Sequence, residues 1–220
     1  MEGIVVINKP HGLTSHDVVA RLRRKFKIRQ VGHAGTLDPM ATGVLVVLLG
    51  KSTKLFNSFV GFDKAYRATM ILGTVTNSAD IYGEVLRTAP YSNITLQNIE
   101  KVFSQFQGEV DQVPPMVSAI KFQGKKLYEL ARKGITVERQ PRKIIIHSLK
   151  IEDVKIPEIK FYLECSKGTY VRQLAEDIGE KLGCGACITQ IERVKVGTFS
   201  LDEAVTIEDV NESHIRHWQN

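Results

Sequence analysis

The sequence predicts an α+β protein with a mixed, largely antiparallel central sheet flanked by helices and loops. Short apolar segments recur along the chain, and Ile159–Cys165 alternates apolar with polar side chains, which is the period of a half-buried strand. Amphipathic segments with helical spacing lie between some of these runs. The order is not the regular βαβ alternation of a doubly wound sheet, so antiparallel pairing is favoured.

Each predicted strand is a short run rich in β-branched and aliphatic residues. In chain order the strands are Gly3–Asn8, Val44–Leu49, Tyr66–Leu72, Ile144–Ile151, Ile159–Cys165 and Ile191–Val196. Each predicted helix places its apolar side chains on one face, and a glycine ends each of the last two. The helices are Ser15–Phe26, Leu96–Phe106, Lys125–Lys133 and Val171–Leu182.

The length and composition predict one domain inside the cell. The 220 residues contain no obvious linker, so we expect a single domain over residues 1–220 with a basic peripheral segment near residues 114–142. The longest apolar run, Val44–Leu49, is much shorter than the roughly 20 residues of a membrane span, and the N-terminus does not resemble a signal peptide. The cysteines, Cys165, Cys184 and Cys187, favour reduced thiols. We therefore expect a cytoplasmic protein without a membrane partner.

Positive charge is clustered along the chain. Lys and Arg outnumber Asp and Glu by 30 to 24. Residues 21–29 contain basic side chains and no acidic one, and Lys121–Lys143 is also strongly basic. Surfaces of one sign attract polyanions, of which nucleic acids are the commonest, although a solvated helix face is the alternative interpretation.

Common cofactor motifs fail on spacing. Gly50-Lys51-Ser52 resembles the end of a phosphate-binding P-loop, but Leu45 occupies the position where that motif requires glycine. Cys184-Gly185-Ala186-Cys187 has no second ligand pair and is better explained as a tight turn after a helix. No HExxH, GxSxG or dinucleotide-binding fingerprint occurs. We expect no metal and no cofactor.

The segment Val31–Gly43, VGHAGTLDPMATG, is the strongest candidate for a functional loop. It consists mostly of small residues, carries the single carboxylate Asp38, and has Pro39 directly after that acid. Small neighbours allow a bulky partner to approach the carboxylate. The alternative is a tight connection in which Asp38 caps the following segment.

Four separated motifs resemble the TruB family of tRNA pseudouridine synthases. They are GHAGTLDPMATGVL from Gly32, DKAYRA from Asp63, PPMVSAIKFQGKKLYELARKG from Pro114 and CSKGTYVRQLAEDIGEKLGCGA from Cys165. They follow the order of the family over about Val5 to Val210. The resemblance implies the pseudouridine synthase fold and an isomerase that converts a flipped-out T-loop uridine, at tRNA position 55, to pseudouridine without a cofactor.

The resemblance also implies roles for individual residues. Asp38 matches the catalytic aspartate, and Arg172 matches an arginine beside it that favours the charged carboxylate. Asp80, in TNSADIYG, matches a carboxylate that orients this arginine. Tyr66 matches the tyrosine that stacks on the flipped base, and His33 matches the residue that fills the space the base leaves.

Further positions follow from the same resemblance. Tyr170 and Ile191 match residues that line the pocket, and Lys121, Lys125 and Lys126 are candidate phosphate contacts. The chain departs from the usual pattern at Ile191, Asn77 and Cys187, where leucine, aspartate and histidine occur in other members. It also stops at Asn220, about where many members continue into a PUA-type domain, so we expect a short form without that domain.

Two other functions remain open from the sequence. One is an N-glycoside hydrolase that uses Asp38 and Asp80 as a carboxylate pair, although a neighbouring arginine suits an anion better than an acid catalyst. The other is a tRNA-binding or RNA-folding module without catalysis. The expected partner is the T-arm stem-loop of tRNA, whether the chain is an enzyme or a binding module. We expect no obligatory protein partner and a monomeric chain.

Overall fold

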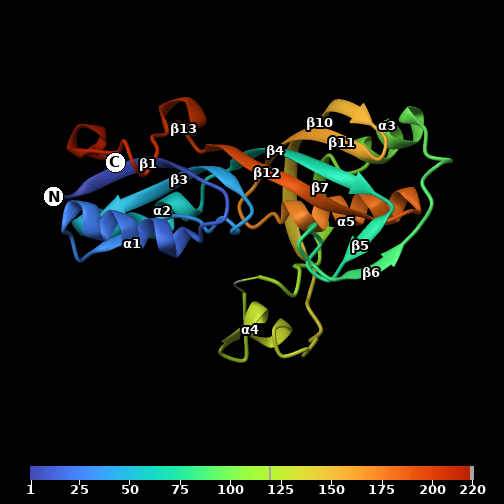
Figure 1. Ribbon diagram of the computed structural model, residues 1–220, viewed down its shortest axis with the longest axis horizontal. Coiled ribbons are helices and arrows are strands. Elements are labelled where there is room, and N and C mark those ends of the chain that lie inside the picture. The colour runs from blue at the N-terminus through green and yellow to red at the C-terminus, as the bar shows by residue number, and fades with distance from the viewer. Residues whose placement is uncertain (119, 219–220) are drawn as a thin grey trace. The chain divides into compact units, whose positions relative to one another are not determined.

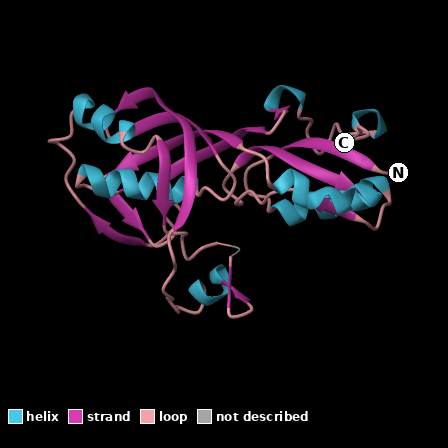
Figure 2. Ribbon diagram, turned by 180° about the vertical axis from the view of Figure 1, so that it is seen from behind, coloured by secondary structure: helices cyan, strands magenta, loops and turns pink. Residues whose placement is uncertain are grey.

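The computed structural model describes residues 1–118 and 120–218, and it divides into two compact units. Unit 1 comprises Met1–Arg67 and Gln190–Asn220, and unit 2 comprises Ala68–Thr189. The chain passes from one unit to the other within strands β4 (Lys64–Leu72) and β12 (Ala186–Val196), so each of these strands has residues in both units (Figures 1 and 2). The expectation of a single domain stays a prediction.

Unit 1 is built on strand β3 and its neighbours. Its further elements are β1 (Gly3–Lys9), α1 (Ser15–Phe26), β2 (Val31–His33), β3 (Thr42–Leu49), η1 (Gly50–Leu55), α2 (Phe56–Val60), β13 (Phe199–Ser200), η2 (Leu201–Glu203) and η3 (Glu212–His214). Strands β1 and β2 pair antiparallel with β3, whereas the end of β12 pairs parallel with it. This local arrangement matters because the candidate loop follows β2 and precedes β3.

Helix α1 begins and ends where its sequence predicts. Thr14 and Asp17 form a reciprocal capping box, in which the Asp17 N–H donates to Thr14 Oγ1 at 3.0 Å. Lys27 adopts a left-handed conformation at the C-terminal end. Val18 and Leu22 are buried on the inner face, which explains why the helix packs on unit 1.

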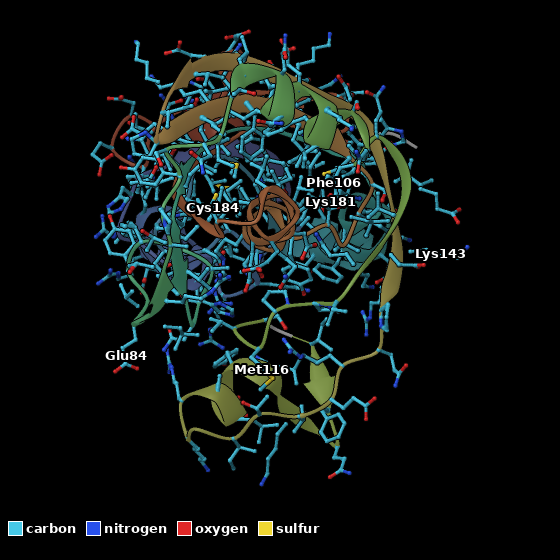
Figure 3. The ribbon with its side chains drawn as sticks, turned by 90° about the vertical axis from the view of Figure 1, so that its right-hand side faces the viewer. Glu84, Phe106, Met116, Lys143, Lys181 and Cys184 are labelled. Carbon is cyan, nitrogen blue, oxygen red and sulfur yellow. The ribbon has the colours of Figure 1, made fainter. Side chains whose placement is uncertain are left out.

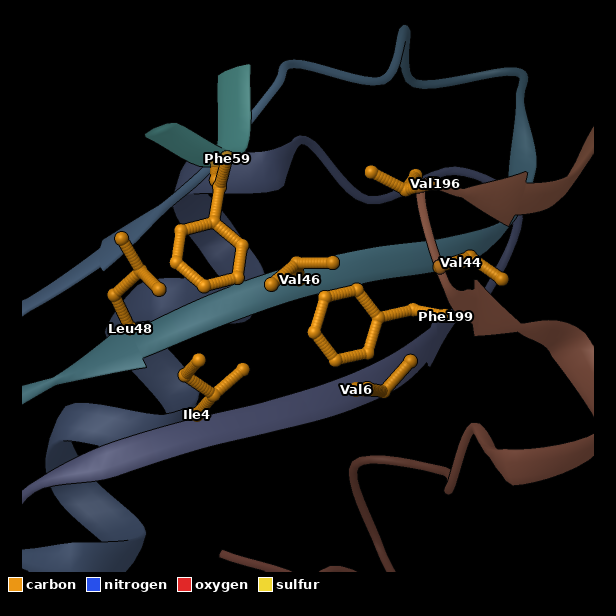
Figure 4. Packing of buried hydrophobic residues seen from close by; sticks show 9 residues of the cluster. Ile4, Val6, Val44, Val46, Leu48, Phe59, Val196 and Phe199 are labelled. Carbon is orange, nitrogen blue, oxygen red and sulfur yellow. The ribbon is translucent and has the colours of Figure 1, made fainter. Parts of the chain in front are cut away.

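One core of unit 1 lies on a single face of β1 and β3 (Figure 4). Alternate residues of these strands contribute to it, as the period of a strand requires. Phe59 of α2 and Phe199 of β13 cover this face, with their rings stacked and 5.9 Å apart. The cluster comprises Ile4, Val6, Ala34, Val44, Val46, Leu48, Phe59, Val196 and Phe199.

Unit 2 is a second sheet region with two helices and a projecting segment. Its elements, besides parts of β4 and β12, are β5 (Thr74–Thr76), β6 (Val85–Thr88), α3 (Leu96–Ser104), β7 (Gly108–Gln112), β8 (Lys121–Phe122), β9 (Lys125–Lys126), α4 (Leu127–Ala131), β10 (Arg142–Lys155), β11 (Glu158–Cys165) and α5 (Val171–Leu182). Strand β10 pairs antiparallel with both β11 and β7. Together with unit 1, these pairings confirm the predicted α+β class and the largely antiparallel sheet.

Helices α3 and α5 pack on unit 2 through aromatic and aliphatic side chains. Phe103 of α3 meets Phe161 of β11 edge-on at 5.8 Å, and Ile178 of α5 is fully buried. Lys181 lies 5.5 Å from the ring of Phe106, and Figure 3 shows these two residues side by side. The predicted bounds of α5 are confirmed, because its apolar face and the left-handed Gly183 are both local signals.

The basic segment near residues 114–142 contains less helix than the sequence predicted. Only Leu127–Ala131 is helical, whereas Lys125–Lys126 pairs with Lys121–Phe122 as a hairpin. The two turn residues, Gln123 and Gly124, both have positive φ (48° and 82°), as a tight two-residue hairpin turn requires. Figure 1 shows the part around α4 projecting from the sheet of unit 2, and Met116 is labelled beside α4 in Figure 3.

The structure also extends two predicted strands. Strand β10 runs from Arg142 to Lys155, and β12 starts at Ala186 rather than Ile191. Among the described residues, no helix is long and apolar enough to cross a membrane. Within the same ranges, no group of three or more His, Cys, Asp and Glu side chains is arranged to hold a metal ion.

Candidate active site

Asp38 lies in unit 1, in a loop whose backbone is bonded to a buried arginine of β12. Arg193 is 1% exposed, and its guanidinium donates to the carbonyl oxygens of Val44, Thr36 and Gly35 at 2.7, 3.4 and 3.1 Å. Two of these acceptors directly precede the turn that carries Asp38. A planar guanidinium has its donors in fixed directions, so Arg193 restrains several carbonyls of the loop together.

The other side of the loop is bonded to groups near the N-terminus. Ser15, the first residue of α1, accepts from the Leu37 N–H at 2.9 Å and donates to the Leu37 carbonyl at 3.2 Å. Lys9 donates to the Pro39 carbonyl at 3.3 Å, and the Gly12 N–H donates to the same oxygen at 2.8 Å. The residues immediately before and after Asp38 are therefore both restrained through their backbone.

Two buried cations share the electrostatic surroundings of Asp38. Burial lowers the pKa of Lys9 to about 8, and the negative charge of Asp38 opposes this shift. Burial also lowers the pKa of Arg193, and interactions with Tyr66 and Asp38 oppose it. Unit 1 thus keeps two positive charges, largely removed from water, within the field of one carboxylate.

Close backbone contact is needed for this arrangement. Gly43 of β3 pairs with Arg193 of β12, and a Cβ atom at Gly43 would lie 2.2 Å from the Arg193 carbonyl oxygen. Its φ of +98° is also disfavoured for residues with a side chain. Glycine at this position lets the strand that carries Arg193 approach β3.

The remaining predicted residues of unit 1 lie on β4, β12 and β2. Tyr66, on β4, is 8% exposed, and Ile191, on β12, is 6% exposed. His33, at the end of β2, meets His16 edge-on at 5.2 Å, and its Nδ1 atom is buried without a hydrogen-bond partner. Burial lowers the pKa of His33 to about 4, helped by His16 and Arg193, so this imidazole is neutral near pH 7.

Arg172 and Asp80 form a buried ion pair in unit 2. An Nη1 atom of Arg172 lies 3.2 Å from Asp80 Oδ2, with side-chain exposures of 4% and 12%. The same nitrogen donates to the Ser78 carbonyl at 2.6 Å, and Nη2 donates to the Val117 carbonyl at 3.0 Å. The guanidinium is therefore bonded to two separate loops as well as to its carboxylate.

Residues of the loop between β5 and β6 donate hydrogen bonds to the Asp80 carboxylate. Its Oδ1 atom accepts from Ser78 Oγ at 2.9 Å and from the Tyr82 N–H at 3.1 Å. Asn77 instead crosses the neck of this loop, where its Oδ1 atom accepts from the Glu84 N–H at 3.1 Å. Asparagine in place of the usual aspartate thus leaves the Arg172–Asp80 pair directly bonded.

Tyr170 directly precedes α5, and Cys187 lies at the start of β12. No side chain of its own caps the helix at Tyr170, whose backbone is instead bonded to Gln112. Cys187 is buried, and burial together with Asp80 raises the pKa of its thiol to about 11. A neutral, buried thiol packs beside the ion pair without competing for Arg172.

The structure brings the predicted residues together in two groups. Asp38, Tyr66, His33 and Ile191 belong to unit 1, and Asp80, Tyr170 and Arg172 belong to unit 2. The contact implied between Asp38 and Arg172 stays a prediction, as do the functional roles of all these residues.

The sequence did not single out several polar residues that hold these groups. They are Lys9, Ser15, Gln112 and Arg193, and each is at most 2% exposed. Each has at least one partner distant in sequence, so neither periodicity nor spacing could identify them.

Comparisons with known proteins identify the family. Residues 23–171 match the model described as TruB family pseudouridylate synthase (N terminal domain), and residues 172–220 match tRNA pseudouridylate synthase B C-terminal domain. The chain is 45% identical over 218 residues to tRNA pseudouridine synthase B of Clostridium tetani, covering 99% of this chain and 75% of that protein. It is 51% identical over 208 residues to the protein of the same name from Protochlamydia amoebophila, covering 93% and 78%.

A solved structure agrees with this result. A chain of the crystal structure of a Cbf5-Nop10-Gar1 complex superposes with a TM-score of 0.75 and 28% identity over 94% of this chain. The match spans 53% of that chain. With family models covering most of the sequence and relatives near half identical over nearly all of it, this chain belongs to the TruB family of pseudouridylate synthases.

Proposed function

We propose that this chain isomerises a uridine of tRNA to pseudouridine, with the T-loop uridine at position 55 as the target. The observation that carries the proposal is the match over 99% of the chain to a relative named tRNA pseudouridine synthase B. The geometry of the loop around Asp38 supports it, because catalysis requires a reactive group in a defined position.

In this reaction the N1–C1′ bond of the uridine breaks and a C5–C1′ bond forms after the base has turned. The proton at C5 leaves, and N1 gains a proton, so substrate and product are isomers. Asp38 either attacks the sugar as a nucleophile, or stabilises the positive charge that develops at C1′ and transfers the proton. Both routes use the carboxylate anion, and Lys9 and Arg193 supply positive charge around it.

A uridine inside folded RNA must leave its stack before it can react. We assign Tyr66 to stacking against the extruded base and His33 to filling the space that the base leaves in the RNA. The neutral state of His33 suits this second role, because an uncharged ring is less costly to insert among bases. Ile191 and Tyr170 are assigned to the walls of the base pocket.

Arg172 and Asp80 form the second part of the proposed site. Arg172 is the proposed charge partner of the reacting carboxylate, and Asp80 orients its guanidinium. Both oxygens of Asp80 accept hydrogen bonds from protein donors, which suits orientation better than proton donation. This observation disfavours a hydrolase that would use Asp80 as its acid.

Binding of the RNA is assigned to the basic regions. Residues Arg21, Arg24, Lys27 and Arg29 are exposed in unit 1, and Lys121 and Lys125 are exposed in the projecting segment of unit 2. Neutralised phosphates release counterions, so affinity for tRNA is expected to fall with salt. We propose that the chain acts on tRNA as a monomer, which sedimentation of the free protein would test.

The first experiment is pseudouridine formation in an unmodified T-arm hairpin and in full tRNA, with EDTA present. We expect product from the native chain and none from Asp38→Asn, which keeps the size of the side chain and loses its charge. Asp202→Asn, an exposed carboxylate of unit 1, is the matched control and should be fully active.

Other outcomes would redirect the proposal. Turnover by Asp38→Asn would remove Asp38 from the chemistry. Tight, salt-dependent tRNA binding without any modified base, even at excess protein, would indicate a binding module. Release of free uracil would indicate a glycoside hydrolase.

A further inference from the structure

Gln112, the last residue of β7, makes an unusual pair of contacts with Tyr170. Its Oε1 atom accepts from the Tyr170 N–H at 2.8 Å, and its Nε2 atom donates to the Tyr170 carbonyl at 3.1 Å. The side chain is 2% exposed, and both ends of the amide are used. A buried amide with both ends bonded to one residue restrains the orientation of that residue strongly.

The restrained residue is the one from which α5 starts. Tyr170 is the N-cap of this helix, and its carbonyl also accepts the first helical bond, from the Leu174 N–H at 3.0 Å. Tyr170 has no side-chain cap, and Gln112 of β7 instead bonds both the N–H and the carbonyl of Tyr170 itself. Arg172 is the second residue of the helix, so the position of its backbone depends on this junction.

The segment that follows Gln112 in the chain contacts the guanidinium of Arg172. Five residues further on, the Val117 carbonyl accepts from Arg172 Nη2 at 3.0 Å. The backbone of Gln112 is restrained as well, because Gln112 pairs with Arg142 at the start of β10. The segment from Gln112 to Val117 therefore contacts both the backbone that carries Arg172 and its guanidinium.

We infer that Gln112 is a positioning residue of the active site, which sets Tyr170 and Arg172 through the backbone at the start of α5. The inference rests on the proposed function, in which these two residues line the pocket and partner the reacting carboxylate. Gln112 itself does not touch the reacting atoms. Its contribution is geometric, and small displacements of catalytic groups lower rates strongly.

Two substitutions separate the contacts. Gln112→Glu keeps the size and the acceptor for the Tyr170 N–H, but it places an oxygen against the Tyr170 carbonyl. Gln112→Met keeps the approximate length and removes both contacts. Gln107→Glu, at an exposed glutamine close by in the same unit, is the matched control.

The test measures single-turnover rate, tRNA affinity and melting temperature for each variant. We expect Gln112→Glu to lower the single-turnover rate by about 10- to 100-fold, with tRNA affinity changed less than about threefold. A residue that served only folding would lower the melting temperature and leave the rate normal below it. A folded Gln112→Glu protein with the native rate would overturn the inference.

A double mutant tests whether the effect passes through Arg172. In an Arg172→Lys background, Gln112→Glu should cost much less than it does in the native chain, because the guanidinium that it positions is already absent. Fully additive losses would contradict the inference.

A spectroscopic measurement is independent of turnover. The ¹⁵N and ¹H signals of the Arg172 guanidinium and the exchange protection of the Tyr170 amide should both change in Gln112→Met. Unchanged signals would overturn the inference even if the native chain formed no pseudouridine, whereas an inactive native chain with changed signals would contradict only the proposed function.

Discussion

The two groups of site residues hold opposite charges by different means. In unit 1 the candidate side chain is the carboxylate of Asp38, and the buried side chains of Arg193, Ser15 and Lys9 donate to backbone carbonyls before and after it. In unit 2 the key side chain is a cation, Arg172, and acceptors are bonded directly to its guanidinium. One unit thus fixes a loop, and the other fixes a side chain.

This difference indicates how each group can act. The hydrogen bonds described around Asp38 go to the backbone of its neighbours, so they restrain the loop that carries it. Arg172 instead has defined partners on both terminal nitrogens. The comparison therefore predicts that unit 1 is sensitive to groups that shape the loop, whereas unit 2 is sensitive to each direct partner of the arginine.

The largest effect is expected from Asp80→Asn in unit 2. The amide keeps the size but leaves the Arg172 charge buried without its counter-charge, which costs about 3 kcal/mol in comparable pairs. We expect turnover to fall by about 100-fold or more and the free energy of unfolding to fall as well. Chemical denaturation and single-turnover assays would measure both, and Asp153→Asn, at an exposed pair in the same unit, is the control.

A native single-turnover rate in a folded Asp80→Asn protein would contradict the prediction that unit 2 is sensitive to each direct partner of Arg172. It would mean that the backbone carbonyls of Ser78 and Val117 are sufficient to orient Arg172.

Arg193→Lys should show the next largest effect, in unit 1. Lysine keeps one charge but cannot reach the carbonyls of Gly35, Thr36 and Val44 together, so the loop around Asp38 is less restrained. We expect a loss of about 2 kcal/mol in stability and about a tenfold loss in single-turnover rate. Wild-type exchange protection of the loop amides in this variant would rule out the proposed restraint.

The pH dependence of the free energy of unfolding should test whether His33 of unit 1 is neutral in the folded chain. Its pKa of about 4 in the folded chain lies below its ordinary value of 6.5, so the unfolded chain binds the proton more readily between these values. Stability should therefore fall as the pH drops from about 6.5 to about 4, by about 1–3 kcal/mol from this group.

His33→Gln should remove that part of the slope, measured by chemical denaturation at several pH values. His147→Gln makes the same substitution at an exposed histidine of unit 2 and is the matched control. The same pH dependence in native and His33→Gln proteins would show that His33 does not titrate on unfolding in this range.

The smallest effect is expected on the exposed basic surface of α1. Arg24→Glu should weaken tRNA binding by about threefold to tenfold at low salt and reduce the salt dependence of binding, because fewer counterions are released. Lys195→Glu makes the same change of charge elsewhere on unit 1. Equal losses in both variants would assign the effect to net charge rather than to this helix.

The elements that the sequence predicted well have local causes. The capping residue Thr14 and the apolar face with Val18 define α1, and Gly183 ends α5, so these helices have the expected bounds. The hairpin at Gln123 was missed, because glutamine rarely adopts positive φ and gives no turn signal. Strand β12 was predicted too short, because its first residues show no alternating pattern.

In the candidate site, too, some residues could be predicted from the sequence and others could not. The motifs identified the segments that carry Asp38 and Arg172 through resemblance to a known family. They did not identify Arg193 or Gln112, since a buried polar side chain is explained only by its partners, which lie far away in the sequence. The direct bond between Asp80 and Arg172 agrees with the expected orientation of the arginine, whose catalytic role stays a proposal.

The glycine beside Arg193 has a consequence for mutational screens. Any side chain at Gly43 would collide with the Arg193 backbone and separate the two strands, which would also displace the donors bonded to the Asp38 loop. A screen that scores only cell growth or product would rank Gly43 with Asp38, although Gly43 has no reactive group. Abundance measured alongside activity would distinguish them, since Asp38→Asn should accumulate as folded protein and Gly43→Val should not.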